Sequence, residues 1–130
     1  MIKKVIIAMT VLIFFILSNY PPLDLVFHTF TNEGYYKYTN YDGSNIMQEG
    51  VHKNYGLDRI KRLHQFWLNK NHEAPDKALY RVFWKNPLAF WRWKNYFQDE
   101  RYKLPYKDWD EIKALAEKNK STTKNPNNSY

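Results

Sequence analysis

The chain has 130 residues, carries a formal net charge of +7 and contains no cysteine. This length allows one domain with a modest core, and the missing thiols exclude disulfides, cysteine-ligated metals and a lipoprotein anchor. Two lysines near each end carry four of the seven charges, which leaves +3 for the body of the chain. Within that body, ten Lys and Arg residues between Lys53 and Lys94 stand against three acidic residues, so the middle third is the basic part.

Residues 1–20 predict a membrane anchor or a signal segment. Two lysines precede an apolar run from Val5 to Leu17, and two prolines follow it. A helix from Lys3 to Tyr20 would be about 27 Å long, at the short end of the range for a transmembrane helix. A cleaved signal peptide is the alternative, although Ser18 offers a poor cleavage position. We favour the single-pass anchor.

The basic residues around this segment also predict its orientation. The lysines precede the apolar run, and no Lys or Arg follows it until Lys37. The positive-inside rule then leaves the N-terminus in the cytoplasm. The rest of the chain is expected on the exoplasmic or periplasmic side.

Residues 21–56 form an irregular segment rich in Tyr, Gly and Asn. Leu23 to Phe30 alternates only loosely, which suits a short strand or a segment in the membrane interface. Asp42-Gly43 is a tight-turn dipeptide. It predicts either a β-hairpin with its arms on both sides or an ordered tyrosine-rich loop.

Residues 57–118 predict a helical domain, and residues 119–130 a disordered tail. The first helix runs from Leu57 to about Asn69 with an apolar arc that includes His64. A second helix starts at Pro75 or Asp76, a third at Asn86-Pro87, and a fourth is capped by Asp108. The expected fold is mainly α: a transmembrane helix or signal sequence, then three to four helices, with the hairpin before them.

The third helix would account for most of the aromatic residues in FWKNPLAFWRWKNYF, Phe83 to Phe97. On a helical wheel five side chains share one inward arc: Ala89, Phe90, Trp93, Tyr96 and Phe97. Trp91 falls on the opposite side. A large ring at such a place is expected to contact a partner.

The sequence offers no catalytic, cofactor-binding or metal-binding constellation. The four histidines are scattered, and no pair has the i, i+4 spacing of a helical metal site. The acidic residues near Asp108 suit helix capping, and no serine lies in a nucleophile motif. Without these features a small hydrolase is a weak alternative, and nucleic acid is a weak candidate partner because no nucleic-acid-binding motif is present.

These features predict a non-enzymatic, membrane-anchored accessory protein that docks onto a larger membrane protein complex. Anionic lipid headgroups are a second candidate contact for its basic face. The alternative is an exported module that binds an anionic polymer or a glycan. Because Arg and Trp dominate known interfaces, the expected partner-binding residues are Arg59, Arg62, Lys85, Trp91, Arg92 and Lys94.

Overall fold

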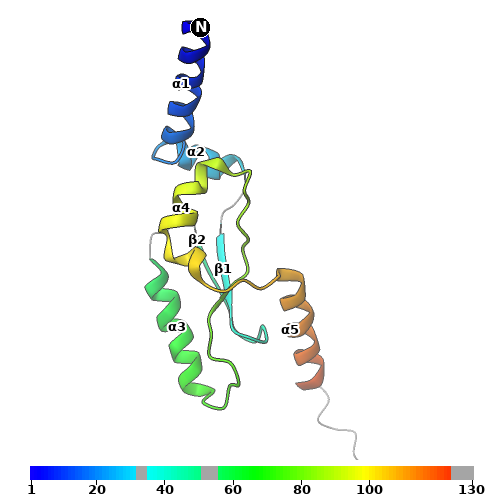
Figure 1. The fold of residues 1–130 in the computed structure, drawn as a ribbon. Coiled ribbons are helices and arrows are strands. Elements are labelled where there is room, and N and C mark those ends of the chain that lie inside the picture. Colours follow the sequence, from blue (N-terminus) through cyan, green and yellow to red (C-terminus); the bar gives the residue numbers. More distant parts are fainter. Residues whose placement is uncertain (32–34, 51–55, 124–130) are drawn as a thin grey trace, which may run out of the picture. The chain divides into compact units, whose positions relative to one another are not determined.

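The computed structural model describes residues 1–31, 35–50 and 56–123 (Figure 1). The chain divides into two compact units. Unit 1 combines Met1–Gly34 with Lys85–Tyr102, and unit 2 combines Tyr35–Trp84 with Lys103–Tyr130. Each unit is therefore built from two separate stretches of chain.

Unit 1 begins with helix α1, Ile2–Leu17, which is 16 residues long. At 1.5 Å per residue it measures about 24 Å, short of the roughly 30 Å hydrocarbon core of a bilayer. None of the helices in the described ranges is both long and apolar enough to cross a membrane. The predicted single-pass anchor over residues 1–20 is therefore wrong, and so is the membrane localisation derived from it. The helix ends at Leu17 because the chain turns at Ser18, three residues earlier than expected.

Two short helical stretches complete most of unit 1, and both differ from the prediction. Leu23–Phe30 forms helix α2 and is neither a strand nor an interfacial segment. The expected third helix from Asn86-Pro87 is replaced by a 3₁₀ turn η1, Phe90–Arg92, and a short helix α4, Trp93–Gln98. Ala89 has a non-helical backbone (φ −79°, ψ 70°), so no helix can run from Pro87 through it. A second 3₁₀ turn, η2, covers Glu100–Lys103.

Unit 2 is built on a small antiparallel sheet with strand order β2-β1-β3. Strands β1, Tyr35–Thr39, and β2, Ile46–Gly50, pair from Tyr35↔Gly50 to Thr39↔Ile46 (Figure 1). This confirms the hairpin around Asp42-Gly43. The Asp42 carboxylate accepts hydrogen bonds from the Asn40 side chain (2.8 Å) and the Ser44 amide (3.0 Å), which closes the turn.

The third strand, β3, Tyr80–Arg81, occupies the place of the predicted second helix. Short apolar runs suit either a helix or a strand, and here neighbouring segments supply hydrogen bonds to an extended backbone. The Val82 amide donates to Lys37 O (3.1 Å), and the Arg81 amide donates to Pro105 O (2.9 Å). The prediction of a helix from Pro75 or Asp76 is therefore wrong, and a mainly α fold is wrong for unit 2, which has this sheet at its centre.

Unit 2 also contains two helices that were predicted, α3 between β2 and β3 in the sequence and α5 after β3. Helix α3, Gly56–Lys70, buries Leu57, Ile60 and His64, as its apolar arc indicated. Helix α5, Trp109–Thr123, starts after Asp108, whose carboxylate accepts from the amide of Asp110 (2.9 Å). The buried apolar residues of unit 2 come from the sheet, both helices and the stretch around β3: Tyr36, Tyr38, Met47, Leu57, Ile60, Leu79, Val82 and Ile112.

Candidate docking surface

Helix α1 leaves its apolar side chains uncovered. None of its residues, all of which lie in the described part of the chain, is buried. Its large apolar side chains are between 38% (Phe15) and 77% (Ile2) exposed. Successive residues point about 100° apart, so Val5, Ile6 and Ile7 with their neighbours make the helix apolar on every side.

The end of α1 is tied to the second stretch of unit 1 by one side chain. The Asn19 amide nitrogen donates to Phe15 O (2.9 Å) and to Phe90 O (2.8 Å). Its side-chain oxygen accepts from the Lys94 amide (3.0 Å). Ser18 is fully buried and donates to Phe15 O as well. These bonds hold the end of α1 against η1 and the start of α4.

Aromatic rings pack around the same point. Phe90 of η1 lies 4.7 Å from Phe15 and 5.6 Å from Phe27 of α2, measured between ring centroids, and both pairs meet edge to face. Trp91 stacks on Phe27 at 5.0 Å with 16° between the ring planes. Edge-to-face and offset-stacked pairs are favourable arrangements. The last turn of α1 is therefore a fixed part of unit 1.

The uncovered apolar surface continues from α1 onto α4. The Trp93 ring lies 6.5 Å from Phe15 in a stacked arrangement and remains 46% exposed. Its indole nitrogen donates to Pro87 O (2.9 Å), which fixes the ring. We call the exposed apolar side chains of α1 together with Trp93 the docking surface. Contiguous apolar patches above a few hundred Å² mark interaction sites in most proteins.

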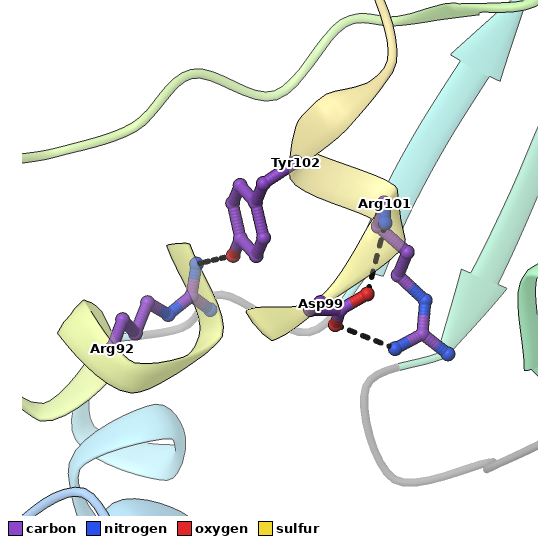
Figure 2. A network of polar contacts seen from close by, with 4 residues as sticks. All are labelled: Arg92, Asp99, Arg101 and Tyr102. Atoms are coloured by element: carbon purple, nitrogen blue, oxygen red, sulfur yellow. Dashed lines mark hydrogen bonds and ion pairs between the residues drawn. The ribbon is translucent and has the colours of Figure 1, made fainter. Parts of the chain in front are cut away.

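A buried polar cluster stabilises the interior of unit 1. Arg92 is only 6% exposed. It contacts His28 Nδ1 through Nη2 (2.9 Å) and Nε (3.2 Å), and its Nη1 donates to the Tyr102 hydroxyl (3.3 Å). Figure 2 shows the contact with Tyr102, together with the Asp99–Arg101 ion pair on the following turn (3.0 Å). Buried charged groups need such hydrogen bonds to offset the loss of water.

The six predicted partner-binding residues fall into two groups. Arg59 and Arg62 are exposed on α3 of unit 2. The other four, Lys85, Trp91, Arg92 and Lys94, belong to unit 1. Trp91 and Arg92 lie in η1 and Lys94 lies in α4, whereas Lys85 precedes both elements.

Their environments differ more than the sequence suggested. Lys85 is exposed, whereas Trp91 is half-buried on Phe27 and Arg92 is buried. Lys94 is half-buried, with its ammonium 4.0 Å from the centroid of the Tyr20 ring. Arg92 and Trp91 therefore pack inside unit 1, while Lys85 is open to solvent.

The helical wheel of residues 87–97 assigned two exposed residues to the interior. Trp93 and Phe97 were expected inside, yet they are 46% and 80% exposed. A 3₁₀ turn has three residues per turn instead of 3.6, so η1 shifts the phase of everything after it. From the sequence, the apolar residues of α1 were interpreted as a membrane segment. No sequence pattern indicated that they contact Phe90.

Metal-binding side chains do not cluster in the part of the chain that the structure describes. No group of three or more His, Asp and Glu side chains there could hold a metal ion. His28 and His64 are buried in different units, and His52 lies outside the described residues. The sequence matches no protein-family model, and it matches no curated protein or solved structure. The docking surface is therefore the main support for a functional proposal.

Proposed function

We propose that the protein is a non-enzymatic accessory protein that docks onto a larger protein complex through helix α1. One observation carries the proposal: α1 is apolar on every side and has no buried residue. A helix that is hydrophobic all round is normally enclosed by other apolar groups. Burial of a large aliphatic side chain stabilises by about 1.5–3 kcal/mol, so the exposed helix has a strong tendency to bind.

The shape of the apolar surface favours a partner protein over a second copy of the chain. Two helices that pack side by side each cover one stripe of the other. Such a pair would leave the remaining faces of α1 in water. A groove or helix bundle of a partner can enclose all faces at once, so a larger protein with an apolar cavity is the occupant that we propose.

The contacts that fix the C-terminal end of α1 support the same proposal. The Asn19 hydrogen bonds and the contacts with Phe90 fix the base of the helix before any partner arrives. A preformed element loses less conformational entropy on binding than a loose segment. Trp93 beside this base adds an aromatic side chain of the kind that dominates binding energy in known interfaces.

The test is photo-crosslinking from two opposite sides of α1 in cells that produce the full chain. A photoreactive phenylalanine derivative at Ile7 and one at Met9 point about 200° apart. We expect both positions to crosslink to the same partner protein. The control position is Leu88, which is exposed in unit 1 but lies outside the docking surface. It should give no such product.

A substitution then tests whether the crosslinked complex depends on the surface. Met9→Asp should lower the yield of the complex at least tenfold, because it places a charge in an apolar enclosure. Leu88→Asp should leave the yield unchanged. Crosslinks only to a second copy, only to lipid, or from only one side of α1 would each show that the proposal is wrong.

A further inference from the structure

An open groove lies in unit 2, where it belongs neither to the docking surface nor to unit 1. Its volume is about 810 Å³, and its lining comes from the β1–β2 turn, the end of α3 with the loop after it, and α5. A second hollow of about 640 Å³ shares Ser44 and Asn119 with it. We propose that this groove binds a neutral oligosaccharide.

Two aromatic rings line the groove. Trp67 of α3 and Tyr41 of the turn are 6.5 Å apart between centroids and tilted by 59°. Both residues are half-buried, so their positions are fixed while part of each remains accessible. Trp and Tyr combine a flat apolar face with a polar edge. The C–H groups on one side of a sugar ring can pack on such a face.

Hydrogen-bonding groups stand beside the rings. The Asn71 side chain donates to Trp67 O (2.8 Å), which fixes its amide and leaves its oxygen as an acceptor. Asp42 is held by Asn40 and Ser44. Burial raises the pKa of Asp42, but the hydrogen bonds from Ser44 and Asn40 outweigh this effect and lower the pKa overall. Ionised carboxylates and amide oxygens accept hydrogen bonds from hydroxyl groups.

The charges of the lining argue for a neutral ligand over an anionic one. Asp42 and Glu73 contribute two negative charges, and Lys70 contributes one positive charge. The adjoining hollow adds Lys120. These Asp, Glu and Lys charges cancel, so they give the groove no excess of positive charge that would attract sulfate, phosphate or uronate groups. Although the middle of the chain is basic, its basic side chains do not dominate this groove.

The test is isothermal titration calorimetry of the full chain with cellohexaose, maltohexaose and the hexamer of N-acetylglucosamine. We expect at least one of the three to bind. Its affinity should stay the same when NaCl is raised from about 0.05 to about 0.5 M, because salt screens only charge-dependent binding. Polygalacturonate of similar length serves as the anionic probe and should not bind.

Substitutions tie the binding to the groove. Trp67→Ala should lower the affinity about tenfold, and Glu73→Ala, at an exposed side chain with no role in the core, about threefold. Phe66→Ala is the matched control, since Phe66 is an exposed aromatic residue on α3 that does not line the groove. Its affinity should equal that of the unaltered chain.

Three results would overturn the proposal. The first is that none of the three neutral hexamers binds. The second is that polygalacturonate binds in a salt-dependent manner while the neutral probes do not. The third is that Phe66→Ala and Glu73→Ala have equal effects on affinity. Trp67→Ala is paired with Glu73→Ala because loss of the Trp67 ring also removes its stacking on His64 (6.0 Å).

Discussion

Gly43 shows how one residue can decide whether a turn and a helix pack together. Its φ is +75°, a backbone conformation that residues other than glycine rarely adopt. A Cβ at this position would also lie 2.9 Å from Ile112 O of α5 and 3.3 Å from the Ala116 methyl group. Gly56 has nearly the same φ, +73°, but no described atom lies within 4 Å of a Cβ there. Comparing the two glycines therefore separates the effect of backbone strain, present at both, from the effect of close packing against α5, present only at Gly43.

We therefore expect Gly43→Ala to lower the free energy of unfolding by about 3 kcal/mol or more, and Gly56→Ala by about 1–2 kcal/mol. The smaller value is the cost of a left-handed backbone alone. The larger value adds the displacement of the turn from α5. Urea unfolding followed by circular dichroism measures both. Equal losses in the two variants would mean that the turn can move away from α5 at no cost.

Asp76 is a second residue whose environment has a measurable consequence. The Tyr80 hydroxyl donates a hydrogen bond to its carboxylate, and the Ala78 amide donates another (2.8 Å). Tyr80 first, and Ala78 after it, hold the pKa of Asp76 below its ordinary value of 3.8. The unfolded chain therefore binds this proton more readily than the folded chain.

This difference makes stability depend on pH in the acid range. The contribution of Asp76 is present above pH 3.8 and is lost as pH falls through the lowered folded-state pKa. Tyr80→Phe should flatten the pH dependence of the unfolding free energy between about pH 5 and about pH 2. The control, Tyr35→Phe at an exposed position, should leave the slope unchanged. An unchanged slope in Tyr80→Phe would contradict the assignment.

At the scale of elements, Asn19 connects one end of α1 to η1 and α4. Its oxygen is the acceptor for the Lys94 amide, and its nitrogen reaches Phe90 O. Asn19→Ala should speed hydrogen exchange of the Lys94 amide at least tenfold. The amide then has no side-chain acceptor, so exposing it to solvent no longer breaks a hydrogen bond to Asn19. Thr10→Ala is the control, since the Thr10 hydroxyl bonds only within α1, to Ile6 O. Equal exchange rates in both variants would show that the aromatic contacts alone hold α1.

The elements also show what the sequence could predict. The hairpin, α3 and α5 carry local signals, namely Asp42-Gly43, a 3.6-residue apolar period and the Asp108 cap. Both helices were predicted, and the hairpin was one of two alternatives for its segment. β3 had no such signal, since its backbone hydrogen bonds go to residues more than twenty positions away, such as Pro105. Tertiary partners decided its conformation. The same holds for η1, where contacts with α2 outweigh the helical pattern.

The docking surface was only partly predictable for the same reason. Arg92 looked like a contact residue because Arg is frequent in interfaces, but the structure buries it against His28. No local sequence pattern predicts a contact between residues 64 positions apart. The apolar character of α1 was evident in the sequence. The length of α1 and its contacts with Phe90 were not evident.

At the scale of the whole molecule, unit 1 depends on two separated stretches, Met1–Gly34 and Lys85–Tyr102. Removing the first stretch would take away Phe15, Phe27 and His28, which contact Phe90, Trp91 and Arg92 respectively. A chain that begins at Tyr35 should therefore lose the fold of residues 85–102, while the hairpin of unit 2 remains. The amide NMR signals of Ala89 and Arg92 should move to random-coil positions.

A shorter truncation is the control for this experiment. Removing residues 2–12 spares Phe14, Phe15 and Asn19, where the contacts described above begin. The signals of Ala89 and Arg92 should then stay near their original positions. If the chain that begins at Tyr35 also keeps these signals, the second stretch of unit 1 folds without the first.

The two long-range hydrogen bonds of the Asn19 side chain span 71 and 75 positions of the chain, which has a consequence for synthesis on the ribosome. Helix α1 is translated first, but Phe90 and Lys94 follow only after about 4–15 s at 5–20 residues per second. During that interval the apolar helix exists without the residues of η1 and α4 that hold its C-terminal end. Any factor that captures nascent apolar segments therefore meets α1 before the rest of unit 1 can hold it.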